Sequence, residues 1–198
     1  YLKMAALFEK NKKWENAKEL YKIILLLDKN NFQSYYRLGI LCIILQDLEN
    51  AFENLKAALQ LENNHPKVLF QMGVLYFSIG NIQEAIMYLT KSLAYNSKNA
   101  YANYYLGLIY KKQKNIILAE QYFNNARKID PNDINIQSSL FDIKILKDKL
   151  KQRWKARLQK NQMDDESGLE LPLPINKAAI DYRIKEDKNL QNSNKKKN

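Results

Sequence analysis

The sequence predicts an all-α protein built from helix pairs that repeat along the chain. Its 198 residues include only 5 glycines and 4 prolines, which is too few for the many turns of a β protein. Small residues and large apolar residues recur every 34 residues, and apolar residues recur at helical spacing within each repeat. These observations favour a solenoid, in which each repeat buries its apolar face against its neighbours.

Four columns of residues keep the 34-residue step in phase with one another. Two columns hold glycine or alanine, and two hold large residues or cysteine. The columns are Ala5, Gly39, Gly73 and Gly107; Ala17, Ala51, Ala85 and Ala119; Phe8, Cys42, Tyr76 and Tyr110; and Tyr21, Leu55, Leu89 and Phe123. Glycine inside a helix costs about 0.5–1 kcal/mol relative to alanine, so glycines in register indicate a close helix crossing.

Two apolar runs at helical spacing, separated by a polar break, make up each complete unit. They predict Phe32–Leu45 and Leu48–Leu61 in the second unit, Pro66–Ile79 and Ile82–Tyr95 in the third, and Ala100–Gln113 and Ile116–Ile129 in the fourth. Pro66 falls in a first helical turn, where the missing N–H of proline costs nothing. Pro131 follows a last turn and ends the array.

Over residues 1–131 the sequence resembles the tetratricopeptide repeat family. The fourth unit carries the pattern of that family most fully, in Leu106, Gly107, Tyr110, Ala119, Phe123, Ala126 and Pro131. The resemblance implies a right-handed α-solenoid of about four helix hairpins. Cys42 stands where the family has tyrosine. Tyr1 takes the fourth position of its repeat, so we expect the first repeat to be truncated and about three residues of its first helix to lie upstream.

After the array, residues 132–160 predict a long capping helix, as the end of a solenoid requires. Its apolar positions are Ile136, Leu140, Ile143, Leu150, Trp154 and Leu158. Its distal part carries the basic residues Lys147, Lys149, Lys151, Arg153, Lys155 and Arg157. This part could clamp an acidic protein tail or an RNA backbone, or it could be an ordinary solvated face. Trp154 and Leu158 favour a partner helix.

The positive charge of the chain, +11 in total, is densest around this helix. Residues 131–160 carry 8 basic and 3 acidic side chains, whereas residues 1–130 carry 17 and 11 and residues 161–198 carry 7 and 7. Such a local excess suits an acidic partner better than it suits diffuse nucleic-acid binding. Residues 161–198 predict an extended or disordered tail, in which the apolar segment Leu169–Ile175 could dock in a groove or serve as a linker.

Residues that could carry catalysis or bind a cofactor do not form a constellation in this sequence. His65 is the single histidine and lies in a turn between repeats, where a surface capping role is expected, because zinc needs three or four ligands. Cys42 is the single cysteine and is expected to be buried packing. We therefore expect no enzyme activity, no cofactor, no metal site and no membrane span.

The resemblance implies that first helices line the concave side of the array, with their second, fifth, ninth and twelfth positions facing a groove. These positions hold Gln33, Tyr36, Ile40 and Ile43; Lys67, Phe70, Val74 and Phe77; and Tyr101, Tyr104, Leu108 and Lys111. An apolar stripe in addition to the core columns is typical of a partner site. The alternative is that the first helices are rotated differently and that some of these residues belong to the core.

Members of the family that bind chaperone C-termini use a clamp of lysine, asparagine and arginine side chains. Here the clamp positions hold Tyr36, Ile40, Gln71, Tyr101 and Tyr105, or, one unit earlier, Leu2, Ala6, Arg37, Lys67 and Gln71. Neither set forms the clamp, so a chaperone C-terminus is not the expected partner. The leading hypothesis is therefore a scaffold that holds an apolar segment of another protein within a larger assembly, such as a ciliary or transport complex. The alternative is an RNA-associated or acidic-tail-binding adaptor. The expected location is cytoplasmic, cytoskeletal or ciliary.

Overall fold

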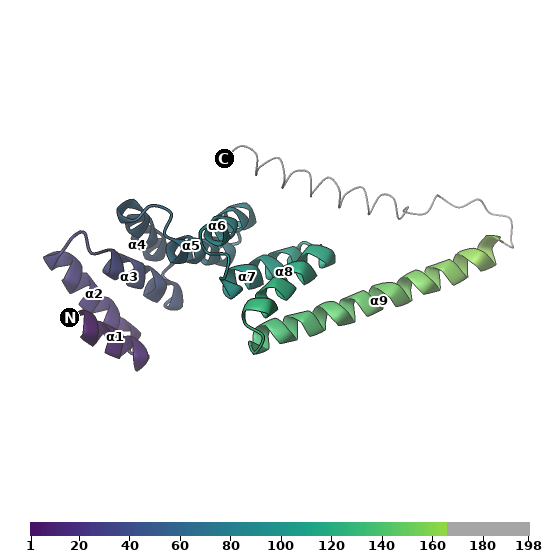
Figure 1. Ribbon diagram of the computed structural model, residues 1–198, viewed down its shortest axis with the longest axis horizontal. Helices are drawn as coiled ribbons and strands as arrows, with labels where there is room; N and C mark the ends of the chain where they lie inside the picture. The colour runs from purple at the N-terminus through teal and green to yellow at the C-terminus, as the bar shows by residue number, and fades with distance from the viewer. Residues whose placement is uncertain (166–198) are drawn as a thin grey trace. The chain divides into compact units, whose positions relative to one another are not determined.

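A computed structural model describes the backbone of residues 1–165 and the side chains of residues 1–158. All regular structure in this part of the chain is helical, which confirms the predicted all-α fold (Figure 1). The helices are α1 Leu2–Lys10, α2 Trp14–Leu27, α3 Phe32–Ile44, α4 Leu48–Leu61, α5 Pro66–Ser78, α6 Ile82–Tyr95, α7 Ala100–Lys112, α8 Ile116–Ile129 and α9 Ile134–Asp165.

Helix bounds in the second, third and fourth units agree with the predicted ones to within one residue. Helices α4, α6 and α8 have the predicted bounds, and α3, α5 and α7 each end one residue early. Side-chain caps explain where α3 and α7 begin. The side-chain oxygen of Asn31 accepts a hydrogen bond from the backbone N–H of Ser34, and Asn99 caps Ala102 in the same way.

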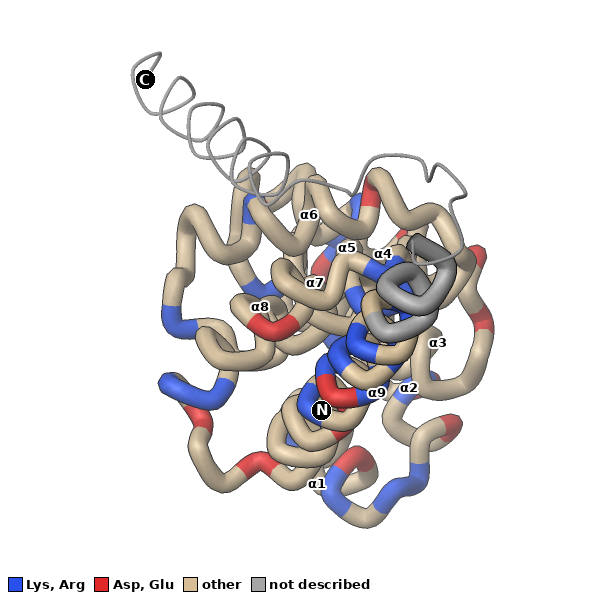
Figure 2. The backbone as a smooth tube through the Cα atoms, turned by 90° about the vertical axis from the view of Figure 1, so that its right-hand side faces the viewer, with Lys and Arg blue, Asp and Glu red and all other residues tan. Residues whose placement is uncertain are grey.

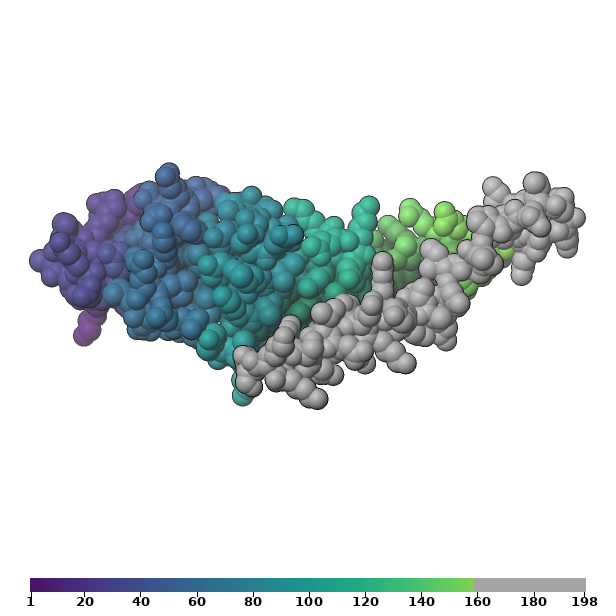
Figure 3. All heavy atoms as spheres, turned by 90° about the horizontal axis from the view of Figure 1, so that it is seen from above, coloured from purple at the N-terminus to yellow at the C-terminus, as the bar shows by residue number. Residues whose placement is uncertain are grey.

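The chain divides into two compact units, Tyr1–Asp148 and Lys149–Asn198. In the first, the hairpins α1–α2, α3–α4, α5–α6 and α7–α8 follow one another in chain order, as the colours from purple to teal show (Figure 3). The second helix of each hairpin contacts the first helix of the next one. First helices also contact each other, α3 with α5 and α5 with α7.

Inside the second, third and fourth hairpins, the glycine of the first helix lies directly against a large side chain of the second. A Cβ atom added at Gly39 would lie 2.6 Å from Leu55 Cγ, and one added at Gly73 would lie 2.6 Å from Leu89 Cγ. At Gly107 the neighbour is the ring of Phe123, also at 2.6 Å. The predicted close crossing is confirmed, and we call this row of contacts the hairpin seam.

Helix α9 begins by packing on the fourth hairpin. Ile136 lies in a buried cluster with Ala100 and Ala126, and Ile143 in another with Ala119 and Phe123. The prediction that residues from Asn161 onward break the helix is wrong, because α9 continues to Asp165.

The reason is chemical. Residues 161–165 include no glycine, proline or β-branched residue, and the first glycine or proline after the start of α9 is Gly168. The prediction of an extended tail, including Leu169–Ile175, concerns residues 166–198, which lie outside the described part of the chain. Among the described residues, no helix is long and apolar enough to cross a membrane.

Candidate partner-binding surface

The apolar residues predicted for the groove lie on α3, α5 and α7, and we call them together the first-helix face. Val74 is a correction, since it is only 8% exposed and belongs to the core between helices. Tyr101 is the most open, with 47% of its surface exposed. The others are half-buried: Tyr36, Ile40, Ile43, Phe70, Phe77, Tyr104 and Leu108. The face therefore combines packing between units with apolar surface that remains open.

Aromatic contacts join α5 to α7 across this face. The rings of Phe70 and Phe77 both meet Tyr105 edge to face, with centroids 5.9 and 5.5 Å away. Tyr104 meets Tyr105 in the same way at 5.9 Å. The sequence pattern places Tyr105 only at a position of the carboxylate clamp. It does not predict that Tyr105 contacts all three other rings of this cluster. The signal that could have found it is its position, one turn from both Tyr101 and Leu108.

Asp133, which immediately precedes α9, and Asp142 within α9 bring acidic side chains to one end of the face. The hydroxyl of Tyr101 donates to a carboxylate oxygen of Asp133 over 3.0 Å, and Lys111 Nζ lies 2.7 Å from an Asp142 carboxylate oxygen. The hydrogen bond to Asp133 raises the pKa of Tyr101. These contacts were not predicted, because the partners are about 30 residues apart in sequence and only the docking of α9 joins them.

The opposite end of the face carries a ring cluster that includes the histidine. Tyr36 stacks on Phe32 with centroids 6.1 Å apart, and the His65 ring lies 4.8 Å from Phe32. The expectation that His65 caps the next helix from the surface is wrong. His65 occupies the N-cap position of α5, but its side chain makes no capping hydrogen bond. The ring packs on the aromatic residues of α3 instead, because that contact removes apolar surface from water.

The six basic residues of α9 that were predicted to bind a partner fall into two groups. Lys147 is engaged, since its Nζ atom lies 2.8 and 3.0 Å from the carboxylate oxygens of Glu120 on α8. The remaining five are exposed and form no ion pair with a described residue: Lys149, Lys151, Arg153, Lys155 and Arg157. Trp154, which lies between Arg153 and Lys155 in the sequence, is 63% exposed. Lysines and arginines recur along α9 in Figure 2.

Within the described residues, no group of three or more histidine, cysteine, aspartate or glutamate side chains is placed to hold a metal ion. Cys42 is buried, as expected, and burial raises the pKa of its thiol. The thiol therefore stays neutral and acts as a small apolar group. The candidate site offers apolar and charged contact surface for a macromolecule.

Solved structures with the same fold support this description. The MamA protein is 25% identical, with a TM-score of 0.63, over 87% of this chain and 96% of that one. PilF of Pseudomonas aeruginosa has a TM-score of 0.68 at 18% identity, over 86% of this chain and 76% of that one. Cut9, from the APC/C hetero-tetramer Cut9–Hcn1, has a TM-score of 0.66 at 23% identity, over 72% of this chain and 29% of that one.

No curated protein matches this chain in sequence. A family model does match, over residues 1–130, and its description is the middle TPR-like domain of cilia and flagella-associated protein 70. These residues contain all four hairpins and the complete hairpin seam. The chain therefore belongs to the tetratricopeptide repeat proteins, in the family of the cilia and flagella-associated protein 70 middle TPR-like domain.

Proposed function

We propose that this protein is a scaffold whose first-helix face holds an apolar helix or extended segment of a protein partner. The observation that carries the proposal is the row of half-buried aromatic and aliphatic side chains that runs over α3, α5 and α7. Residues of this kind, partly fixed by their neighbours and partly open, are typical of interaction hot spots.

Contacts between successive first helices support the position of this site. Because α3 contacts α5 and α5 contacts α7, the first helices form a closely spaced layer. In a curved stack the closely spaced layer lies on the inner side, where one ligand can contact several repeats. An apolar ligand segment there would contact Phe77 and Tyr104 at the same time.

The chemistry of the face favours an apolar ligand over a carboxylate terminus. At the positions where a carboxylate clamp needs cations and amides, the chain has Tyr36, Ile40, Gln71, Tyr101 and Tyr105. None of these is a cation. One unit earlier the positions hold Leu2, Ala6, Arg37, Lys67 and Gln71, so neither register supplies the full clamp. We propose a multi-subunit assembly as the setting, and the family description favours a ciliary or flagellar one.

Peptide selection followed by alanine substitution tests the proposal. A displayed peptide library is selected on the protein, and the affinity of an enriched peptide is measured by calorimetry. Phe70→Ala, Phe77→Ala and Tyr104→Ala should each weaken binding by about 1–3 kcal/mol. Tyr95→Ala is the matched control, because this exposed tyrosine lies on α6, away from the face. Equal losses in the control, or none in the three variants, would contradict the proposal.

A second candidate is an acidic partner bound by α9. Five exposed cations that form no ion pair with a described residue, next to exposed Trp154, favour it. Binding there should weaken steeply as salt is added, because exposed charges are screened, whereas binding to the first-helix face should depend little on salt. Replacing Lys149, Lys151, Arg153 and Lys155 with glutamine should remove the salt-dependent part and leave the melting temperature unchanged. A fall in melting temperature would show that these side chains pack in the fold.

A further inference from the structure

Stacked tyrosines join the two helices of the third and fourth hairpins. Tyr76 stacks on Tyr88 with centroids 5.3 Å apart, and Tyr110 on Tyr122 with centroids 5.4 Å apart. In the second hairpin the equivalent positions, 34 residues before Tyr76 and Tyr88, hold Cys42 and Asn54. The second hairpin therefore lacks this ring pair.

A third aromatic ring is missing beside Cys42 and Asn54. Between the second and third hairpins, Phe52 meets the edge of Tyr76 with centroids 6.1 Å apart. The residue equivalent to Phe52, 34 positions earlier, is Lys18. A cluster of three aromatic rings at the junction of the second and third hairpins thus corresponds to a lysine, a cysteine and an asparagine at the junction of the first and second.

The structure has a cavity where these rings are missing. Its volume is about 320 Å³, within the range of roughly 300–1,000 Å³ for small-ligand sites. All three replacing residues line it, together with residues of α2, α3 and α4. The lining residues are Lys18, Lys22, Leu25, Leu26, Leu38, Cys42, Asn50 and Asn54.

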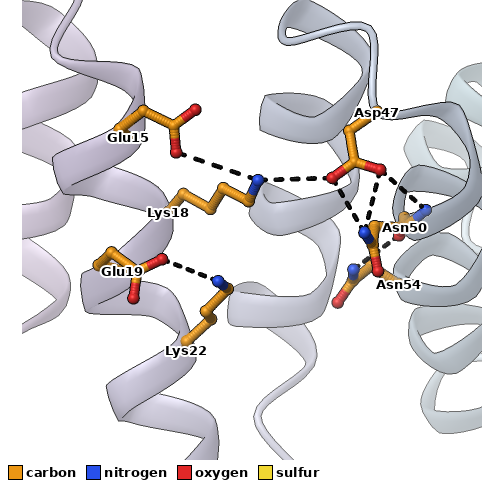
Figure 4. A network of polar contacts seen from close by, with 7 residues as sticks. All are labelled: Glu15, Lys18, Glu19, Lys22, Asp47, Asn50 and Asn54. Atoms are coloured by element: carbon orange, nitrogen blue, oxygen red, sulfur yellow. Dashed lines mark hydrogen bonds and ion pairs between the residues drawn. The ribbon is translucent and has the colours of Figure 1, made fainter.

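The cavity has an apolar floor and a polar rim. Leu38 and Cys42 are almost fully buried, whereas Leu26 at the edge is 80% exposed. Figure 4 shows the rim, in which Lys18 Nζ lies 3.4 Å from an Asp47 carboxylate oxygen, and the Asn54 side-chain nitrogen donates to the backbone carbonyl of Asn50 over 2.6 Å. Lys18 and Asn54 are thus held in place before any ligand arrives.

One cation of the rim corresponds to a lysine that contacts a ring in the next hairpin. Lys56, 34 residues after Lys22, places its Nζ atom 5.9 Å from the centroid of the Phe52 ring. Lys22 has the same position beside the cavity, and its one ion pair with a described residue is to exposed Glu19, at 2.8 Å. It can therefore turn toward an aromatic ring as Lys56 does.

We propose that this cavity binds an aromatic side chain, preferably tyrosine, from a partner polypeptide, which takes the place of the rings missing from the second hairpin. The apolar floor covers the ring faces, Lys22 offers a cation–π contact, and the Asn54 side-chain oxygen can accept the phenol O–H. The cavity is lined by α2, α3 and α4 and shares no residue with the first-helix face. The proposal therefore stands independently of the proposed function.

Titration with p-cresol, the side-chain analogue of tyrosine, tests the aromatic preference. The methyl resonances of Leu25, Leu26 and Leu38 are followed by NMR and should shift saturably. An aliphatic alcohol of matched size, 4-methylcyclohexanol, should bind at least about tenfold more weakly. Equal affinities, or no saturable shift with p-cresol, would overturn the proposal.

A variant with the cavity filled provides the structural control. Cys42→Tyr combined with Asn54→Tyr recreates the tyrosine pair of the following hairpins and should abolish the p-cresol shifts while the fold is kept. Asn54→Leu is a smaller filling change for the case that the double variant fails to fold. Phe77→Ala, on the first-helix face, should bind p-cresol as the native protein does. Retained p-cresol binding in a folded, filled variant would place the ligand elsewhere and refute the proposal.

Peptide selection connects the cavity to a polypeptide ligand. A displayed library is selected on the native protein and counter-selected on the filled variant. The remaining peptides should share a tyrosine, phenylalanine or tryptophan, and changing that residue to alanine should remove binding. Peptides without a common aromatic residue would contradict the proposal. The first-helix face is unchanged in both proteins, so failure here leaves the proposed function untouched.

Discussion

The hairpin seam, between the two helices of each hairpin, and the first-helix face are both apolar, yet their side chains differ in burial. On the seam, Leu55, Leu89 and Phe123 are fully buried against glycine. On the face, Phe70, Phe77 and Tyr104 remain half-exposed. The difference teaches that a repeat can devote one stripe to folding and keep part of a second one for a partner. Changes in the seam should thus affect stability most, and changes in the face should affect binding most.

Phe123→Ala should have the largest effect on stability. The ring fills the space beside Gly107 and also contacts Tyr104 and the buried Ile143, so its removal leaves a cavity at the junction of three helices. We expect a loss of about 3–5 kcal/mol in the free energy of unfolding, measured by urea denaturation. A loss below about 1 kcal/mol would show that the seam is less important than its burial indicates.

Gly73→Leu should come second. The added side chain would collide with Leu89, and the Leu89 backbone nitrogen at 3.1 Å cannot move without displacing α6. Overpacking of this kind costs about 1–3 kcal/mol, which thermal melting would detect. Ala94→Leu, at an exposed position of α6, is the matched control and should melt like the native protein. Identical melting of both variants would refute the close crossing.

Tyr21→Phe tests the seam in the first hairpin, where Ala5 and Tyr21 take the seam positions. The Tyr21 hydroxyl donates to a Glu9 carboxylate oxygen over 2.6 Å, and Glu9 also pairs with Arg37 of the next hairpin at 3.3 Å. Removing the hydroxyl should cost about 1.5 kcal/mol in chemical denaturation at neutral pH. Tyr35→Phe, a half-buried tyrosine with no such bond, serves as the control.

The same variant makes a prediction about pH. Burial, and then the bond to Glu9, raise the pKa of Tyr21, so the folded state favours the neutral phenol. This contribution to stability is complete below the unfolded tyrosine pKa of about 10 and falls as the pH rises above that value. The native protein should therefore lose stability above pH 10 more steeply than Tyr21→Phe does. Parallel pH profiles would show that the phenol is not protected by the fold.

Phe77→Ala should have the smallest effect on stability. It tests most directly whether the first-helix face differs from the hairpin seam. Its ring is half-exposed and contacts Tyr105 edge to face, so we expect a loss of only about 1 kcal/mol in unfolding free energy. A loss as large as that of Phe123→Ala would mean that the first-helix face is core. In that case the exposed remainder of the face would be too small to serve as the main partner site.

Much of the fold follows from the sequence alone, because its signals are local or strictly periodic. Helix bounds depend on apolar spacing, on caps such as Asn31 and on Pro66, and all of these lie within the segment they define. The seam was predictable as well, since glycine three times in register inside helices indicates close packing. The end of α9 is less predictable, because the polar residues 161–165 weaken a helix without ending it and the first glycine is Gly168.

Only the tertiary structure decided how much of each first helix stays open and what its side chains contact. Val74 and Phe77 lie one turn apart on α5, yet one is buried and the other is not, because the rotation of α5 against its neighbours sets burial to within a fraction of a turn. The bond between Lys147 and Glu120 likewise depends on where α9 docks. The cavity beside Cys42 exists because three substitutions that are far apart in sequence meet in space, and a single sequence does not show which positions meet until its helices are packed.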